Sequence, residues 1–507
     1  MYELLPAGAT GAGALLYGWR MRQASVPDLH AIARQTLIEA GFDPDFPPAI
    51  AQELAAIDRQ HPPADNSVRD ARSLLWSSVD NSESRDLDQV EYAERLPGGD
   101  IRLLIGIADV DEFVPKGSAT DEHARANTVS VYTPGTVFPM LPERLSTGVT
   151  SLLEGDDKLA VVVALVVNAD GAVTASDVYR ALVRNRAQLV YEPVGAWLEG
   201  RAPAPPQVAG DEELSAQLRL QEEATARLSA LRRRNGALNL ELETPAPVVA
   251  GGKVVGLAAQ EHNRARDIIE SFMVAANTAM AKLLEARGVP SLRRVVHKPE
   301  QWPRMVELAE SLNDQLPAEP SSRALADFLA RRKVADPAHY RELSLAVLKL
   351  LGAGEYMVEA PGVDQEGHFG LGVGDYTHST APNRRYPDLV TQRCLKSVIA
   401  GAAPPYTTDE LYELAAHCNR MESAARKIER RMRKVAAAAL LSDRVGEVFT
   451  GLVTGVKDKG TFVRLLAPPA DGRVVKGERG LNVGDRVRVR LLATDVARGY
   501  IDFARAS

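Results

Sequence analysis

The sequence predicts an α+β protein in three parts: a small helical module over residues 1–65, a large mixed domain over 66–443 and a small β-barrel over 444–507. Three observations predict this fold. Apolar residues recur at helical spacing near the amino terminus, apolar runs typical of strands precede long helical patterns in the middle, and short β-rich runs separated by glycine fill the end. A chain of 507 residues exceeds the usual size of one domain, which agrees with several parts.

The amino-terminal part contains two helical patterns, "SVPDLHAIARQTLIEAG" and "FPPAIAQELAAIDRQ". In the first pattern Ser25 is a candidate cap, Pro27 falls in the first turn and Gly41 marks the end. Two short helices across a turn can form a helix-turn-helix-like module, and generic helical packing explains the pattern equally well. The segment "HPPADNS" (61–67) is the expected linker to the next part.

The central part predicts a sheet accompanied by helices. "IRLLIGIADVDEFV" and "KLAVVVALVVNADGAV" contain apolar runs typical of strands. Helical patterns follow over 211–234, 261–287, 301–314, 341–351, 386–400 and 407–443. This mixture is typical of a large α+β domain.

The carboxy-terminal part has a different rhythm. "GEVFTGLVTGVKDKGTFVRLL", "GERGLNVGDRVRVRLLATD" and "GYIDFA" are short β-rich runs with glycines between them, and five such strands would form an OB-fold barrel. Residues 446–507 contain 11 Lys and Arg against 7 Asp and Glu, a net charge of +4. A basic patch of this kind suits nucleic acid, although a single charge run is more often only a solvated face.

Composition restricts the class of protein. The whole chain has a net charge of −7, which does not exclude nucleic-acid binding because binding depends on local patches such as "ARKIERRMRK" (425–434). No run of about 20 apolar residues predicts a membrane span, and the amino terminus lacks the basic region of a signal peptide. Cys394 and Cys418 are too few for a disulfide framework, so that a reducing, cytoplasmic setting is expected.

The stretch "SSVDNSESRDLDQVEYAERL" (77–96) carries Asp80, Asp86 and Asp88 within nine residues. Carboxylates this dense repel one another, and a divalent cation would relieve the repulsion. Magnesium prefers oxygen ligands and keeps waters that can attack phosphorus. Spacing alone favours the simpler interpretation, an exposed acidic loop.

The same stretch resembles the acidic signature of the RNB-domain family, which includes ribonucleases II and R and the exosome nuclease. That signature has aspartates at positions matching Asp80, Asp86 and Asp88, and a fourth at the position of Gln89. Further blocks that resemble the family follow in its order, over 106–114, 130–152, 269–277 and 368–395. In the last block the arginine pair and "YPDL" remain, while four residues depart from the commonest ones: Ser379, Ala381, Asn383 and Gln392.

The resemblance implies a set of site residues. Asp80, Asp86, Asp88 and the weaker neutral ligand Gln89 would hold magnesium, with manganese as a possible substitute. Arg384 would steady the charge of the scissile phosphate. Further expected contacts to RNA are a stacking tyrosine, a second arginine and a glutamate: Tyr191, Arg385 and Glu429. Arg385 would contact a neighbouring phosphate or pair structurally, and packing and ion pairing are the rival interpretations for Tyr191 and Glu429.

The carboxy-terminal barrel resembles an S1-type RNA-binding domain. An aromatic flanked by basic residues favours stacking on bases, and Phe462 with Lys457 and Lys459 forms such a group, although Phe462 could instead belong to the core. No lysine-rich tail follows, so that the chain resembles ribonuclease II more than ribonuclease R. The amino-terminal part is atypical, since family members usually carry two cold-shock barrels there.

The resemblance therefore implies a processive 3′-to-5′ exoribonuclease that hydrolyses single-stranded RNA to 5′-mononucleotides by metal-assisted in-line attack of water. The expected partner is single-stranded RNA, with no membrane and no obligate protein partner, and the chain is expected to be a monomer. Gln89 supports a rival from another class, a catalytically weak RNA-binding protein that retains the fold. A DNA exonuclease is a less favoured alternative.

Overall fold

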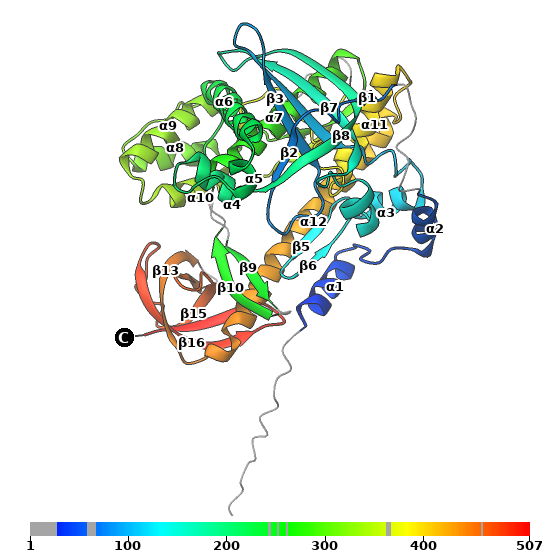
Figure 1. Ribbon diagram of the computed structural model, residues 1–507. Helices are drawn as coiled ribbons and strands as arrows, with labels where there is room; N and C mark the ends of the chain where they lie inside the picture. The colour runs from blue at the N-terminus through cyan, green and yellow to red at the C-terminus, as the bar shows by residue number, and fades with distance from the viewer. Residues whose placement is uncertain are drawn as a thin grey trace, which may run out of the picture.

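The computed structural model describes residues 28–57, 67–241, 245–250, 253–259, 262–360, 367–457 and 460–506. Within these ranges no helix is long and apolar enough to cross a membrane. The large domain, the barrel and the long helix between them are visible in Figure 1. Residues 61–66 of the predicted linker lie outside the described residues.

The large domain is built on a strongly curved six-stranded sheet in the order β1-β8-β2-β3-β4-β7. Its strands are β1 (Arg69–Asp70), β2 (Trp76–Asp80), β3 (Gln89–Arg95), β4 (Ile101–Ala108), β7 (Asp157–Val167) and β8 (Val173–Val190). The 18-residue strand β8 pairs antiparallel with β7 through its first part and parallel with β2 through its last part, so that the sheet curls round on itself. The parallel pairing brings the carboxyl ends of β2 and β8 together, with Asp80 opposite Val190.

Helices and short hairpins surround this sheet. α6 and α7 pack against it, because their apolar faces share one core with β3, β4 and β7. The helices of the domain are α3 (Ala119–Asn127), α4 (Tyr191–Leu198), α5 (Pro206–Ala209), α6 (Glu212–Arg234), α7 (Arg264–Ala286), α8 (Trp302–Ser311), α9 (Ser322–Ala335), α10 (Tyr340–Leu351), α11 (Tyr386–Ala400) and α12 (Thr408–Leu441). Two hairpins are β5 (Val131–Thr133) with β6 (Thr136–Phe138) and β9 (Pro245–Ala250) with β10 (Lys253–Ala259), and a further two-stranded sheet pairs β11 (Ser291–Val295) with β12 (Glu355–Glu359).

The carboxy-terminal part is a closed five-stranded barrel in the order β13-β14-β15-β17-β16, as the sequence predicts. Its strands are β13 (Val448–Lys457), β14 (Gly460–Leu465), β15 (Asp471–Lys476), β16 (Arg486–Asp495) and β17 (Tyr500–Arg505). Helix α12, which begins with a capping box of Thr407 and Glu410, runs from the large domain to the barrel (Figure 1). Its last turns pack into the barrel core through Ala437, Ala438 and Leu441.

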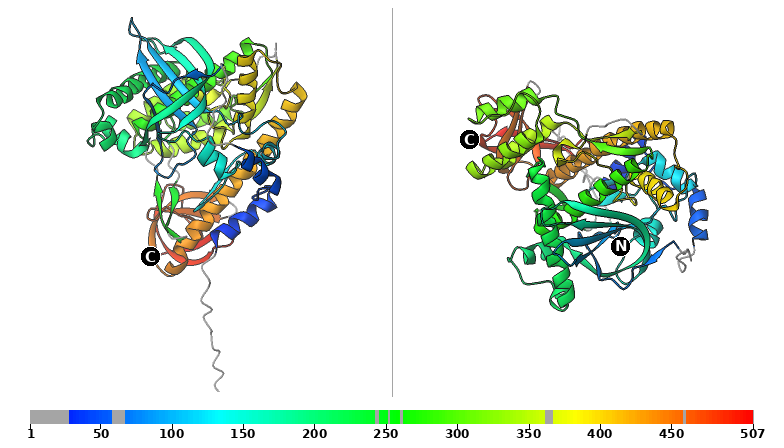
Figure 2. Two further views of the ribbon diagram at one scale, coloured as in Figure 1. Left: turned by 45° about the vertical axis from the view of Figure 1, so that its right-hand side comes forward. Right: turned by 90° about the horizontal axis from the view of Figure 1, so that it is seen from above.

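The two helices near the amino terminus lie on the large domain (Figure 2). α1 (Leu29–Glu39) packs on α12, and α2 (Pro48–Ala56) packs on α3. Glu53 of α2 accepts hydrogen bonds from the backbone N–H groups of Ala119 and Thr120 at 2.6 and 2.9 Å, which caps α3. Whether residues 1–65 form a module that binds nucleic acid stays a prediction.

The cap of α1 differs from the sequence prediction. The helix begins at Leu29, and Asp28 is the cap, because its carboxylate accepts a hydrogen bond from the N–H of Ala31 at 3.2 Å. The predicted cap Ser25 and the neighbouring Pro27 lie outside the described residues. Gly41 follows the helix with a φ of +89°, which agrees with the predicted end.

Candidate active site

The acidic loop connects β2 to β3. Asp80 is the last residue of β2, Gln89 is the first residue of β3, and the other two aspartates lie between them. Ser151 fixes this loop, because its hydroxyl accepts from the N–H of Leu87 at 3.0 Å and donates to the carbonyl of Arg85 at 2.7 Å. Ser151 belongs to the sequence block 130–152, so this block helps to hold the acidic loop in place.

Asp88 is the most buried of the three aspartates, with 2% of its surface exposed. Its Oδ1 accepts a hydrogen bond from the backbone N–H of Asn383 at 3.2 Å. Its Oδ2 has no hydrogen-bond partner and lies 3.4 Å from Nε of Arg384. Burial raises the pKa of Asp88 to about 7, against the opposing effect of the Arg384 charge.

Asp80 and Gln89 are joined directly. The amide nitrogen of Gln89 donates a hydrogen bond to Oδ2 of Asp80 at 3.2 Å, and Gln89 is 6% exposed. Burial raises the pKa of Asp80 to about 7, the Arg384 charge lowers it, and the negative charge of Asp86 raises it further. In this arrangement Gln89 supplies Asp80 with a donor, whereas an aspartate there would add a charge.

The acidic loop fits a partly hydrated cation better than a closed cage of protein ligands. No three His, Cys, Asp or Glu side chains in the described ranges lie close enough together to enclose a metal ion. The Oδ2 atom of Asp88 is, however, a buried acceptor without a hydrogen-bond partner, and the cation beside it is Arg384. Magnesium usually keeps several waters and is held by one or two carboxylates together with substrate phosphates. One or two carboxylates from among Asp80, Asp86 and Asp88 would satisfy that requirement.

Arg384 faces the acidic loop from the segment that precedes α11. Its side chain is 48% exposed, so the guanidinium can contact Asp88 and still reach a ligand. The carbonyl of Arg384 accepts from the N–H of Ser130 at 3.0 Å, and the N–H of Tyr386 donates to Thr128 at 2.8 Å. These bonds hold Arg384 and Tyr386 beside the residues that precede β5.

Tyr132 of β5 is a site residue that the sequence analysis missed. Its hydroxyl lies 3.5 Å from Oδ2 of Asp86, and Arg384 interacts with the same hydroxyl. Burial raises the pKa of Tyr132 to about 12, so that the phenol stays protonated. The sequence gives one hint, since Tyr132 belongs to the block 130–152 that resembles the family.

Glu429 lies behind Tyr132 on α12. Its Oε1 accepts a hydrogen bond from the backbone N–H of Tyr132 at 3.2 Å, and burial raises the pKa of Glu429. The glutamate therefore anchors β5 to the long helix. A direct contact of Glu429 with RNA stays a prediction.

Arg385 forms a structural ion pair, which is the second of the two roles that the sequence leaves open for it. Its guanidinium forms two hydrogen bonds to Asp388, from Nε at 2.9 Å and from Nη2 at 2.6 Å. Asp388 is fully buried and also accepts from the N–H of Ala381 at 2.8 Å. This pair fixes the turn that presents Arg384, and a phosphate contact of Arg385 stays a prediction.

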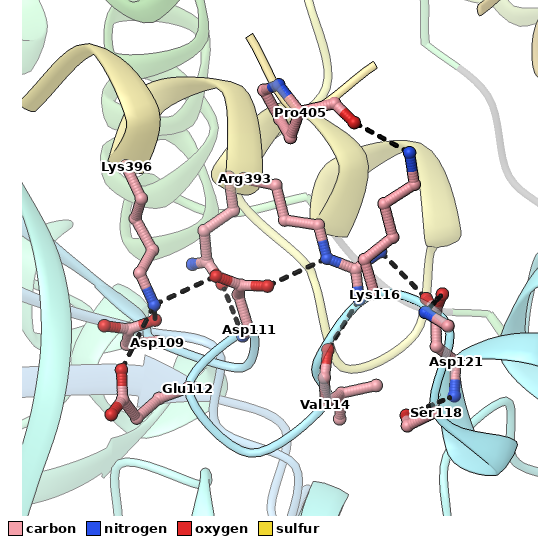
Figure 3. A network of polar contacts seen from close by, with 12 residues as sticks. Asp109, Asp111, Glu112, Val114, Lys116, Ser118, Asp121, Arg393, Lys396 and Pro405 are labelled. Carbon is pink, nitrogen blue, oxygen red and sulfur yellow. Dashed lines mark hydrogen bonds and ion pairs between the residues drawn. The ribbon is translucent and has the colours of Figure 1, made fainter. Parts of the chain in front are cut away.

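A network of charged groups fixes α11 itself (Figure 3). Arg393 donates to Asp111 at 2.8 Å and pairs with Asp121 at 2.8 Å. Lys396 lies 2.9 Å from Asp109, which also pairs with Arg180 at 2.9 Å. The network joins α11 to the loop after β4. The turn that contains Arg384 and Arg385, directly before α11, is therefore held against the sheet (the arginine turn).

Tyr191 is the first residue of α4, directly after the end of β8 and therefore beside Asp80. The guanidinium of Arg266 lies 4.3 Å from the centre of its ring. Arg266 also donates to Oδ1 of Asn81 in the acidic loop at 3.0 Å and pairs with Glu192 at 2.9 Å. Arg266 is a second residue that the sequence analysis missed, because only the tertiary fold brings α7 to this loop.

Two of the predicted RNA-binding residues of the barrel, Lys457 and Phe462, lie on β13 and β14. Phe462 is 36% exposed, and Lys457 is exposed at the end of β13. Phe462 therefore does not belong to the barrel core. Lys459 lies outside the described residues.

Sequence comparisons find two domains. Residues 68–401 match the RNB domain, and residues 447–506 match the RNase II-type exonuclease C-terminal S1 domain. Ribonuclease R of Thermotoga maritima is 30% identical over 505 residues, which cover 93% of this chain and 69% of that protein. Ribonuclease R of Escherichia coli is 30% identical over 504 residues, with 91% and 60% covered. The chain thus spans 60 to 69% of the length of these two relatives.

Solved structures share the fold. RNase R of Mycoplasma genitalium, in a complex with ribose-methylated single-stranded RNA, superposes with a TM-score of 0.84 at 24% identity, covering 94% of this chain and 78% of that one. Yeast Ssd1, a pseudonuclease, superposes with a TM-score of 0.67 at 16% identity, covering 89% and 56%. The fold alone therefore does not separate an active nuclease from an inactive one, and the site residues must do so.

Proposed function

The chain belongs to the RNB family of exoribonucleases, and from this premise we propose that it hydrolyses single-stranded RNA processively from the 3′ end to 5′-mononucleotides. The observation that carries the proposal is the pairing of Asp88 with Arg384. A buried carboxylate oxygen without a hydrogen-bond partner lies 3.4 Å from a half-exposed guanidinium. Such an arrangement offers a carboxylate oxygen to a metal ion and a cation to a phosphate at the same place.

RNB-family nucleases are metal-dependent, and we propose that magnesium is the metal here, with manganese as a substitute. Asp80, Asp86 and Asp88 would hold it, with Gln89 in contact with Asp80. When bound, the metal supplies a Lewis acid for the phosphate and lowers the pKa of water.

The remaining tasks belong to the protein. Arg384 can bind a non-bridging phosphate oxygen while its Nε stays beside Asp88, and its permanent charge suits the transition state. The phenol of Tyr132 stays protonated and can donate a hydrogen bond near Asp86. Tyr191, whose ring stacks with Arg266, forms an aromatic surface beside Asp80 on which a base can stack.

The barrel and the large domain would then share the substrate. Lys457, Lys459 and Phe462 would bind upstream RNA, while a narrow path to the acidic loop would admit one unpaired strand, so that wide duplexes stall. RNase R of Mycoplasma genitalium has been solved in a complex with single-stranded RNA, and this chain is proposed to bind RNA in the same way. Action as a cytoplasmic monomer is part of the proposal.

A second candidate function is RNA binding without efficient cleavage, and the Gln89 amide beside Asp80 favours it. A single experiment separates the two functions. Single-stranded RNA labelled at its 3′ end should release labelled mononucleotide at once in magnesium and none in EDTA, whereas full-length 5′-labelled RNA should be converted to a short end product with few intermediates. Retention of both labelled RNAs without shortening, at magnesium concentrations that saturate the protein, would favour the binding protein.

A further inference from the structure

Glu91 is a carboxyl that neither the acidic motif nor the proposed mechanism uses. It lies on β3 two residues after Gln89 and is completely buried, with 0% of its surface exposed. Neither carboxyl oxygen has a hydrogen-bond partner, and the ion pairs among the described residues do not include Glu91. Burying a carboxyl in this state is costly, so the group needs a physical explanation.

The surroundings of Glu91 connect it to the acidic loop. Successive side chains of a strand point to opposite faces, so that Gln89 and Glu91 lie on the same face of β3. Gln89 contacts Asp80 at 3.2 Å. Burial and then the negative charge of Asp80 raise the pKa of Glu91 well above its usual value, and burial, Asp80 and Glu91 raise the pKa of Tyr191. The fully buried Glu91 and the partly buried Asp80 and Tyr191 therefore lie in one region of the fold.

Glu91 is fully buried and Asp80 is partly buried, so both carboxyls can be ionised together only if a positive partner lies beside them. Arg384 acts on Asp80, but its other contact is Asp88. A divalent cation beside Asp80 and Glu91 would give the unpartnered oxygens of Glu91 a ligand and would cancel the repulsion between the two carboxylates. Two carboxylates are sufficient, because magnesium completes its shell with water and phosphate oxygens.

We propose that Glu91 replaces the missing fourth aspartate of the acidic motif and, together with Asp80, holds a divalent metal ion. Gln89 then orients Asp80 through its amide, while the carboxylate has moved two residues along the same face of the strand. The inference rests on the proposed function to the extent that both place metal at the acidic loop. It differs in assigning a residue that the motif does not contain.

The test counts metal ions. Manganese binding to the full chain, without RNA, is measured by titration calorimetry and by the EPR signal of free manganese. The parent should bind about two ions, as two-metal nucleases do. Glu91→Gln should lose one ion, or bind it at least about 10-fold more weakly. The double variant Gln89→Asp/Glu91→Gln returns the carboxylate to its usual position and should recover the lost ion.

Glu94→Gln is the matched control. Glu94 lies on the same strand but pairs at the surface with Arg102 at 3.2 Å, so its removal should leave manganese binding unchanged. Circular dichroism without metal establishes that each variant folds. If Glu91→Gln does not fold, Glu91→Met carries the test, because it fills a similar volume without polar atoms.

Unchanged manganese number and affinity in the folded Glu91 variants would overturn the inference and make Glu91 a neutral core residue. The proposed function has a separate readout. A parent chain that binds two ions but cleaves no RNA would contradict the proposed function and leave the metal assignment of Glu91 intact. A parent chain that cleaves RNA, with Glu91 variants that keep both ions, would contradict only this inference.

Discussion

Asp88 shows how burial turns an acidic residue into a reactive one. Its side chain is almost inaccessible, one oxygen is unpartnered, and Arg384 is its nearest cation. Asp88→Asn keeps the shape but removes the charge that is proposed to hold metal. Turnover should fall by about 100-fold or more, because the charge acts mainly in the transition state. Release of mononucleotides is followed on a denaturing gel, and RNA affinity, measured by filter retention, should stay close to that of the parent.

Glu94→Gln serves as the control for this experiment too, since it removes a carboxylate from β3 outside the acidic loop. Parent-like release of mononucleotides by folded Asp88→Asn would contradict the assignment of the metal site. A loss of RNA affinity that matches the loss of rate would instead assign Asp88 to substrate binding.

The stability of the metal-free chain should depend on pH through the same carboxyls. Asp80 and Asp88 have a pKa of about 7 when folded, against about 4 for an unfolded aspartate. Between these values the folded chain holds more protons than the unfolded chain, so the free energy of unfolding should decrease as pH rises from about 4 to 7. Asp88→Asn cannot titrate and should show a smaller decrease. Urea unfolding in EDTA at pH 5 and pH 7.5 measures both slopes, and equal slopes would refute the prediction.

At the residue scale the sequence identifies the motif residues but not their neighbours. Asp80, Asp86, Asp88 and Arg384 come together in the structure, as the resemblance implies. Tyr132 and Arg266 reach the loop through tertiary contacts that no local pattern encodes. Glu91 lies only two residues beyond Gln89, but it resembles an ordinary strand residue until its burial is known.

At the element scale, the position of α11 depends on the charged network shown in Figure 3. Asp109 is 1% exposed and pairs with both Arg180 and Lys396. Asp109→Asn removes one carboxylate from both cations, but Arg180 keeps Glu112 and Lys396 keeps Asp111, so the free energy of unfolding should fall by about 1–3 kcal/mol. Because α11 carries the arginine turn, kcat should also fall. Chemical denaturation and steady-state cleavage measure the two effects.

Lys116 provides the comparison within the same network. It pairs with Glu410 at 2.9 Å, but both side chains are about two-fifths exposed. Lys116→Met should change the free energy of unfolding by no more than about 1 kcal/mol, because exposed pairs contribute little. Equal losses for Asp109→Asn and Lys116→Met would mean that burial does not set the importance of these contacts.

Periodicity predicts most of the long helices, with one exception. The pattern over 386–400 coincides with α11, and 407–443 differs from α12 only at its ends. The prediction passes over α9, although Leu325, Phe328 and Leu329 have helical spacing and are buried. The register between β2 and β8 depends on residues about 110 positions apart, so it could not be read from a local pattern.

At the scale of the whole molecule, α12 makes the barrel part of the fold. Ala437, Ala438 and Leu441 lie in the barrel core, and a Cβ at Gly499 would come within 3.0 Å of α12. Deleting residues 446–507 would therefore expose the apolar end of α12 as well as remove RNA-binding groups. The role of the barrel is better tested by surface substitutions, which leave this contact unchanged.

Substitutions on the β13–β14 hairpin should separate RNA capture from cleavage. Phe462→Ala removes an aromatic ring on which a base can stack and should weaken RNA binding by about 1–3 kcal/mol. Lys457→Gln removes one phosphate contact and should reduce the slope of log K against log salt by about 0.7. The kcat at saturating RNA should be unchanged, because Asp88 and Arg384 lie in the other domain.

Tyr500→Ala, which removes a more exposed aromatic from β17 of the same barrel, is the matched control. Filter binding at several salt concentrations measures affinity and slope together. If the Phe462 and Lys457 variants bind RNA with the parent's affinity and the parent's slope of log K against log salt, the RNA does not cross this face of the barrel.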